Sequence, residues 1–253
     1  MILDQFRLDG QTALVTGASA GLGTAMAIAL AQAGANVVCH GNSRSAEQTC
    51  RQIEKLGRKA ATVTSDLSKA GGAEELFDKA QQFAPLDILV NNAGTIRRAE
   101  ATEYSDEDWS AVLQVNLNSV WKLCQAAGRG FLSRKRRGKI INIASLLTFQ
   151  GGITVPAYAA SKGAVAQLTK ALANEWAAHH VNVNAIAPGY MRTDNTAALQ
   201  RDELRNRQIL ERIPAGRWGE PSDLAGTVVF LASAASSYIH GHVLVVDGGW
   251  MGR

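Results

Sequence analysis

Short runs of aliphatic and β-branched residues alternate along the chain with longer segments in which apolar positions recur at helical spacing. Apolar runs of about four to eight residues predict buried strands, and the periodic segments predict helices. Strands are predicted at 12–16, 36–40, 60–65, 87–91, 139–144, 181–187 and 242–247. Helices are predicted at about 22–33, 46–56, 106–133 and 157–178, and another begins near Pro221.

Strands this apolar are typical of a parallel sheet with helices on both faces. Short connections and right-handed crossovers favour an α/β fold with a Rossmann-like, doubly wound sheet of seven strands in the order 3-2-1-4-5-6-7. A length of 253 residues suits one domain, and we find no internal repeat or linker. We therefore expect a single domain over residues 1–253, with its ligand site beyond the carboxyl ends of the strands.

Composition and charge argue against several classes of protein. Hydrophobic residues make up 46% of the chain and charged residues 19%, which is typical of a globular protein. No apolar run reaches the roughly 18 residues of a membrane span, and the first residues lack the pattern of a secretory signal. Cys39, Cys50 and Cys124 have neither metal-ligand spacing nor an even count, so we expect no metal site and no disulfide. A cytoplasmic protein without a membrane partner is predicted.

The net charge is +4, and the densest basic run extends from Arg134 to Arg137. Such a run could bind nucleic acid, or it could end a helix, where cations complement the helix dipole and Gly138 would act as a stop. We favour the helix end because no aromatic residue or nucleic-acid motif accompanies the charges. We expect no nucleic-acid partner, and the positive field should favour small anionic ligands.

A glycine-rich segment lies where the first predicted strand meets the first predicted helix. Glycines there allow a tight turn and a close approach to a pyrophosphate, which the free N–H groups of the helix start attract. The alternative is a tight turn that serves only helix packing. The nucleotide interpretation places these residues against a cofactor: Gly17, Ser19, Ala20, Gly21, Leu22 and Gly23.

The end of the second strand lacks the carboxylate expected for a free ribose 2′-hydroxyl. Its residues are His40, Gly41, Asn42, Ser43 and Arg44. Neutral donors and a guanidinium accept a 2′-phosphate, which favours NADP(H) over NAD(H), although Arg44 could also cap a helix or face water.

Two more segments follow strands at the same edge. Asp66 and Leu67 come after the third strand, where Asp66 could accept from the adenine amino group or cap the next helix. After the fourth strand, the chain could contact adenosine or simply turn, and one asparagine should tie neighbouring strands together. These residues are Asn91, Asn92, Ala93 and Gly94.

Tyr158 and Lys162 are four residues apart in a predicted helix and therefore share one face. The ammonium of Lys162 should favour the phenolate and lower the pKa of Tyr158, which would make the phenol an acid or base near neutral pH. Ser145 directly follows the fifth strand and could bind the same substrate oxygen. Taken alone, a tyrosine and a lysine at this spacing usually form an exposed helical pair.

The order of these segments changes that interpretation. Thr16-Gly17-x3-Gly21-x-Gly23, Asn91-Asn92-Ala93-Gly94, Asn116, Ser145, Tyr158-x3-Lys162 and Pro188-Gly189-x3-Thr193 follow one another at strand ends or on adjoining helices. This order resembles the short-chain dehydrogenase/reductase family over essentially the whole chain. The resemblance implies a nicotinamide-dependent oxidoreductase and a homotetramer formed through the two long helices.

The same resemblance implies roles for individual residues. Ser145 would orient the carbonyl, Tyr158 would be the general acid/base, and Lys162 would lower the pKa of Tyr158 and bind the ribose. Asn116 would hold a water of the proton relay. The carboxamide of the nicotinamide would be held by Thr193 and by the backbone near Ile186 to Gly189. The cofactor contacts implied in this segment are Pro188, Gly189, Met191 and Thr193.

Further segments resemble one subgroup of the family, including Gly94–Arg98, Ser145–Gly152, Arg212–Gly219 and Asp247–Trp250. They are similar to the 2-deoxy-D-gluconate 3-dehydrogenase, 2-dehydro-3-deoxy-D-gluconate 5-dehydrogenase and unsaturated-uronate reductase enzymes of uronate catabolism from pectin or alginate. The resemblance implies hydride transfer between NAD(P)(H) and a keto or hydroxy group of a deoxy sugar acid. The alternatives are a reductase of 3-oxoacyl thioesters or polyols, and a non-catalytic dinucleotide sensor.

A sugar-acid substrate would explain several polar residues near the site. Four arginines could pair with its carboxylate or form surface ion pairs: Arg97, Arg98, Arg192 and Arg217. Candidate hydroxyl partners are Thr148, Gln150 and Asn195, and Trp218 and Trp250 could cover the sugar ring or anchor the core. The polar segment at about 190–215 has helical spacing and is predicted to be a substrate lid.

Overall fold

The structure is a computed structural model that describes residues 1–253. It contains seven strands, β1 (Thr12–Val15), β2 (Asn36–Gly41), β3 (Ala60–Thr64), β4 (Ile88–Asn91), β5 (Gly138–Ile143), β6 (Val181–Pro188) and β7 (Val243–Val246). All strand pairs are parallel, and their order is β3-β2-β1-β4-β5-β6-β7. The predicted fold and strand order are confirmed.

Most helices follow the predicted periodic segments, whereas the helix at Gly72–Phe83 was not predicted. The helices are α1 (Gly21–Gln32), α2 (Glu47–Lys55), α3 (Gly72–Phe83), α4 (Asp106–Leu113), α5 (Ser119–Ser133), α6 (Pro156–Trp176), α7 (Ala197–Arg201), α8 (Glu203–Arg212) and α9 (Ala225–Ala232). The long helix predicted at 106–133 is α4 and α5 joined by a π-helical turn at Gln114–Asn118. No helix combines the length and the apolar character needed to cross a membrane.

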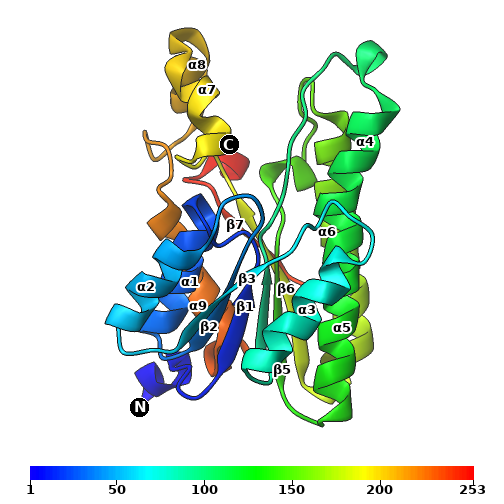
Figure 1. Cartoon of the computed structure of the whole chain (residues 1–253). Helices are drawn as coiled ribbons and strands as arrows, with labels where there is room; N and C mark the ends of the chain where they lie inside the picture. Colours follow the sequence, from blue (N-terminus) through cyan, green and yellow to red (C-terminus); the bar gives the residue numbers. More distant parts are fainter.

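Two apolar cores cover the two faces of the sheet, because successive side chains of a strand point to opposite sides. Ala13 and Val15 pack in the core under α1 and α9, whereas Leu14 packs in the core under α3, α5 and α6. Figure 1 shows these two helix layers on either side of the sheet, with α7 and α8 beyond its edge. The sheet is therefore buried on both faces, and its carboxyl edge is left to form a site.

The basic run ends a helix, as expected, but Gly138 does not stop it. Helix α5 ends at Ser133, and the residue with a left-handed backbone is Lys135, with a φ of 50°. Gly138 is instead the first residue of β5, where a Cβ atom would lie 2.2 Å from the Phe131 ring. Arg134 donates to the carbonyl of Leu86 at 2.7 Å, so part of the run serves the fold.

Candidate active site

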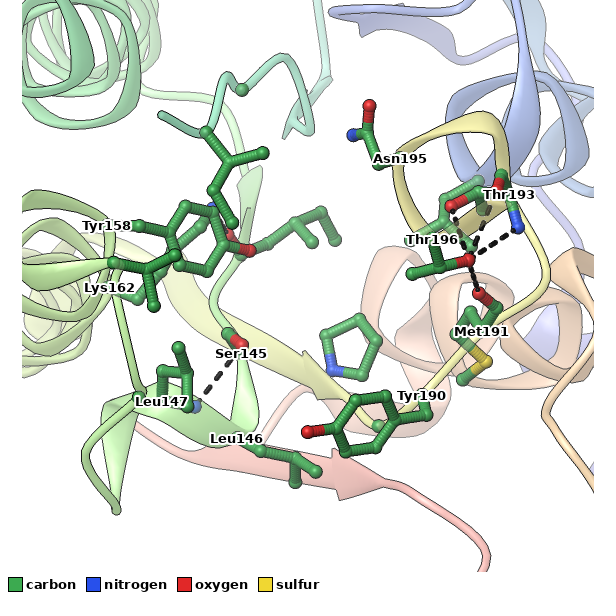
Figure 2. A pocket seen from close by; sticks show the side chains of 18 of the residues that line it. Ser145, Leu146, Leu147, Tyr158, Lys162, Tyr190, Met191, Thr193, Asn195 and Thr196 are labelled. Atoms are coloured by element: carbon green, nitrogen blue, oxygen red, sulfur yellow. Dashed lines mark hydrogen bonds between the residues drawn. The ribbon is translucent and has the colours of Figure 1, made fainter. Parts of the chain in front are cut away.

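A cavity of about 670 Å³ opens at the carboxyl edge of the sheet. Its walls come from the glycine-rich turn before α1, the ends of β4, β5 and β6, the start of α6, and the α7–α8 segment. Figure 2 shows Ser145 and Tyr158 on one side of this cavity and Thr193, Asn195 and Thr196 across from them. The structure thus brings the predicted reacting residues and the predicted lid to one space.

Tyr158 and Lys162 both line the cavity from the first turns of α6. Helix α6 begins at Pro156, which suits a first helical turn because proline has no N–H to leave unpaired. The Lys162 ammonium lies 5.6 Å from the centroid of the Tyr158 ring and donates to the carbonyl of Ile143 at 2.6 Å. The predicted shared face is confirmed, and β5 fixes the position of the lysine.

The electrostatics of the phenol differ from the expectation. Burial raises the pKa of Tyr158, while the Ser145 hydroxyl and the positive charge of Arg98 act in the opposite direction. Burial also lowers the pKa of Lys162 to about 8. The expected lowering of the Tyr158 pKa by Lys162 is therefore wrong for the protein by itself, because the desolvation of the phenol is the larger effect. The cation that favours the phenolate here is Arg98.

Ser145 lies at the end of β5, where its hydroxyl accepts from the backbone N–H of Leu147 at 3.2 Å. It caps a short 3-10 turn at Leu146–Thr148, which fixes its side chain beside Tyr158. Thr148 does not line the cavity, since its hydroxyl donates to the carbonyl of Lys162 at 3.0 Å. Thr148 is therefore a support for α6, and its expected contact with a substrate hydroxyl is wrong.

Asn116 is fully buried in the π-helical turn and does not line the cavity. Its side chain accepts from the N–H of Thr95 at 2.8 Å and donates to the Thr95 carbonyl at 2.9 Å and to Ser161 at 3.2 Å. The side-chain atoms are thus used within the protein. Asn116 therefore positions the chain after β4, and its role in holding a relay water stays a prediction.

The glycine-rich turn fits a pyrophosphate. Gly17 and Gly21 have φ values of 65° and 53°, which favour glycine. A Cβ atom on Gly23 would lie 2.1 Å from the carbonyl oxygen of Gly17, so only glycine allows this close approach of helix and turn. Ala20, the N-cap residue of α1, makes no side-chain cap, and the first turn contains no acidic residue. Free N–H groups at such a helix start attract a phosphate.

Two asparagines at the end of β4 hold the glycine-rich turn and the neighbouring strand in place. Asn92 donates from its side chain to the carbonyl oxygens of Thr16 at 2.8 Å and Gly17 at 3.2 Å. Asn91 donates to Asn142 at 2.9 Å and so ties β4 to β5, as expected. Asn92, Ala93 and Gly94 line the cavity beside the turn.

At the end of β2, His40 is buried and connects three segments. Its Nδ1 accepts from the N–H of Gly17 at 3.2 Å, and its Nε2 lies 3.0 Å from the carbonyl of Ser65. With Nδ1 as acceptor, Nε2 carries the proton and donates to Ser65. Burial lowers the pKa of His40, which keeps this neutral form. His40 supports the glycine-rich turn from behind.

The other residues predicted to contact the adenosine part of the cofactor lie outside this cavity. Asp66 accepts from the N–H of Ser68 at 3.0 Å and from Asn42 at 3.2 Å, while α3 begins later, after Gly71. The alternative in which Asp66 caps the next helix is therefore wrong. Arg44 is exposed and pairs with Asp194 of the lid segment at 3.3 Å. Gly41, Ser43 and Leu67 also lie outside that cavity.

Four predicted nicotinamide contacts, Pro188, Gly189, Met191 and Thr193, all line the cavity after β6. Gly189 packs tightly, since a Cβ atom there would lie 2.7 Å from the Cα atom of Asp247. The hydroxyl of Thr196 donates to the carbonyl of Met191 at 2.6 Å and so holds the start of the lid.

The four candidate arginines differ in whether they line the cavity. Arg98 lines the cavity. The other three form ion pairs away from it: Arg97 with Asp108 at 3.3 Å, Arg192 with Glu220 at 2.9 Å, and Arg217 with Asp223 at 2.7 Å. The predicted contact of Arg97 with a substrate carboxylate is therefore wrong, because Asp108 in the first turn of α4 pairs with its guanidinium.

Arg205 and Arg212 of α8 line the cavity and were not predicted. The guanidinium of Arg212 lies 4.1 Å from the centroid of the Trp250 ring and donates to Gln150 at 3.3 Å. Gln150 and Asn195 line the cavity as predicted. Arg205 and Arg212 are seven residues apart, which places them on one face of a helix. This spacing is the feature of the sequence that could have predicted them as a pair.

The two candidate aromatic residues differ in their positions. Trp250 lines the cavity, whereas Trp218 is buried beside it and donates from Nε1 to Asn206 at 2.7 Å. Trp218 therefore anchors α8 through Asn206. No group of three or more histidine, cysteine or acidic side chains that could hold a metal is present.

A family model described as enoyl-(acyl carrier protein) reductase matches residues 17–251. The chain belongs to the short-chain dehydrogenase/reductase family. It is 53% identical to the 2-dehydro-3-deoxy-D-gluconate 5-dehydrogenase of Escherichia coli (strain K12), with 100% of both chains covered. Among solved relatives is an Agrobacterium tumefaciens protein, provisionally assigned as a 2-deoxy-D-gluconate 3-dehydrogenase with bound NADP. It is 52% identical, with a TM-score of 0.92 and coverage of 98% of this chain and 99% of the other.

A second solved short-chain dehydrogenase, a gluconate 5-dehydrogenase from Burkholderia cenocepacia, was crystallised with NADP and tartrate. It is 38% identical, with a TM-score of 0.94 over 100% of both chains. The family assignment agrees with the resemblance carried by the sequence motifs.

Proposed function

We propose that this protein is an NADP(H)-dependent dehydrogenase of a deoxy sugar acid of the 2-keto-3-deoxygluconate type. The observation that carries this proposal is the single cavity in which Ser145, Tyr158 and Arg98 meet a glycine-rich turn suited to a dinucleotide. A non-catalytic sensor would have no need of this combination. The solved relatives named for 2-deoxy-D-gluconate and gluconate share the fold over 98% and 100% of this chain.

The proposed chemistry follows from where the residues lie. A bound nicotinamide supplies or accepts the hydride. In the reducing direction Tyr158 donates its phenolic proton to the substrate oxygen, and the Ser145 hydroxyl stabilises the negative charge that develops there. Lys162, held by the Ile143 carbonyl, lies beside the phenol and would bind the ribose hydroxyls. In the opposite direction the same groups remove the proton.

A preference for NADP(H) is supported by the residues after β2. No acidic side chain from this strand end faces the position of the 2′-phosphate, and Arg44 offers an exposed guanidinium. Its partner Asp194 is also exposed, so their ion pair contributes little and can exchange for a phosphate. Solved relatives with bound NADP support the same assignment.

Substrate recognition is proposed to rest on the cavity arginines. Arg98 acts on the Tyr158 side of the cavity, and Arg205 and Arg212 reach it from α8. Guanidinium groups bind carboxylates through paired hydrogen bonds. Since α8 belongs to the segment at 190–215, binding of the substrate carboxylate would hold this lid closed. The tartrate seen in the gluconate 5-dehydrogenase relative is itself a dicarboxylate.

The test is a steady-state assay of NADPH and NADH oxidation with 2-keto-3-deoxygluconate, unsaturated-uronate products, neutral polyol-derived ketones and 3-oxoacyl thioesters. Arg98→Gln should raise KM about tenfold or more for acidic sugars and leave KM for neutral substrates nearly unchanged, whereas any change in kcat through Tyr158 should be the same for both kinds of substrate. Arg97→Gln is the matched control, because Arg97 pairs with Asp108 outside the cavity. Preferred turnover of acyl thioesters would contradict the proposal.

The assembly is proposed to be a cytoplasmic homotetramer formed through the long helices. Trp109 and Trp121 on α4 and α5 remain 39% and 37% exposed in one chain, which leaves apolar surface for a partner. The three cysteines are free and buried, as suits a reducing compartment. Light scattering after gel filtration measures the mass directly, and a monomer would contradict the assembly.

A further inference from the structure

A second cavity, of about 420 Å³, lies at the opposite, amino-terminal edge of the sheet. Loops that lead into the strands form its walls, so it is separated from the catalytic cavity by the length of the strands. Its charged and titratable lining residues are Asp87, Arg136, Arg137, Lys139, His180 and His240. Nothing in the proposed reaction uses them.

Lys139 is the most unusual of these groups. It is the second residue of β5, only 8% exposed, and its ammonium has a single hydrogen bond, to the Ser236 hydroxyl at 3.2 Å. An ammonium can donate three hydrogen bonds, and a buried charge without a counter-ion is costly. Burial, with a further contribution from Arg137, lowers the pKa of Lys139 to about 8. The lysine therefore lacks an anionic partner.

The only carboxylate in this cavity is already used. Asp87 pairs with Arg136 at 3.2 Å and accepts from the backbone N–H of Thr12 at 3.0 Å. Arg137 and Lys139 form no ion pair. The cavity thus has an excess of positive charge that the protein itself does not neutralise.

His240, which also lines this cavity, carries a second polar group without a partner. The side-chain nitrogen of Asn182 lies 3.2 Å from Nε2 of His240 and also contacts the carbonyl oxygens of Ser236, Ser237 and Ile239 at 3.3, 3.1 and 2.9 Å. The amide nitrogen carries only two hydrogens, which these carbonyls already share. Nδ1 of His240 is buried and has no partner. Buried polar atoms are normally satisfied.

We propose that this cavity is a binding site for a small oxyanion, with phosphate or carboxylate oxygens accepting from Lys139 and Arg137. Its size suits a compact ligand rather than a dinucleotide. Lys139 is the second residue of the strand whose last residue, Ile143, accepts from Lys162, so the same strand contacts both sites. The proposal concerns a different edge of the sheet and stands independently of the proposed reaction.

The test is calorimetric titration of the full-length protein with inorganic phosphate and, separately, with succinate, each with and without saturating NADP. Binding that persists with NADP present is expected for at least one of them, and the comparison distinguishes phosphate from carboxylate chemistry. Arg137→Gln and Lys139→Gln should each raise the dissociation constant about tenfold or more. Arg137 is exposed, so its variant should fold even if replacement of buried Lys139 does not.

Two matched variants locate the binding. Arg129→Gln removes one exposed positive charge elsewhere and should change the dissociation constant by less than about twofold. Arg98→Gln alters the catalytic cavity and should also leave it unchanged. The proposal is overturned if neither anion binds, if NADP abolishes all binding, or if Arg98→Gln or Arg129→Gln weakens binding as much as Arg137→Gln does.

Discussion

Replacement of Gly23 by alanine isolates the role of the glycine-rich turn. The added Cβ atom would lie 2.1 Å from the Gly17 carbonyl oxygen and 2.6 Å from the Asn92 side-chain nitrogen, whereas ordinary contact begins near 3.4 Å. The Gly17 carbonyl must therefore move by more than 1 Å, and it belongs to backbone that cannot rotate away. Overpacking of this kind costs about 1–3 kcal/mol of the free energy of unfolding.

For a domain of this size, that loss lowers Tm by about 2–12 °C. The displaced turn should also raise the NADPH dissociation constant about tenfold or more, since pyrophosphate binding depends on the position of its N–H groups. Thermal unfolding by circular dichroism and titration of NADPH fluorescence measure the two effects. Gly226→Ala in α9 is the control, because nothing lies within 4 Å of its added Cβ atom. If Gly23→Ala kept the Tm and the NADPH affinity of the wild type, this reasoning would be refuted.

Three further predictions concern groups around the two edges of the sheet. His40→Leu leaves the Gly17 N–H without its acceptor and should lower the free energy of unfolding by about 1–3 kcal/mol in urea titrations; an unchanged midpoint would show that the bond contributes nothing. Because burial lowers the pKa of Lys139 from 10.5 to about 8, the unfolded chain binds more protons between these pH values, and the contribution of Lys139 to stability rises with pH across this window. Lys139→Met should remove that rise from urea unfolding curves, whereas parallel pH profiles for the two proteins would contradict it. Arg44→Ala should raise KM for NADPH about tenfold and leave KM for NADH nearly unchanged, and equal effects would exclude a 2′-phosphate contact.

The fold was predictable because each strand is a short apolar run and each helix a longer periodic one. The ends of the elements, the range of α3 and the π-helical turn between α4 and α5 needed the structure. Gly138 illustrates the limit: its sequence context resembles a helix stop, but the ring of Phe131 is what requires glycine there. Such a contact joins α5 to β5, and local residue preferences carry no information about it.

The catalytic residues were predictable because they lie at strand ends or at helical spacing. Their electrostatics were not, since the pKa of Tyr158 depends on burial and on Arg98, which comes from a different loop. The positions of the arginines also depend on contacts between distant segments of the chain. Arg97 and Arg98 are adjacent in the chain, but α4 provides a carboxylate partner only for Arg97, and Arg212 reaches the cavity through the packing of the lid on Trp250.

The central claim is that the Tyr158 hydroxyl exchanges the proton while the nicotinamide exchanges the hydride. Tyr158→Phe removes only that oxygen and keeps the ring beside Lys162. Measured by stopped-flow and steady-state NADPH oxidation with 2-keto-3-deoxygluconate, kcat should fall about 10²- to 10⁴-fold, while the NADPH dissociation constant stays within about twofold. A kcat close to that of the wild type would contradict the assignment of Tyr158 as the acid/base.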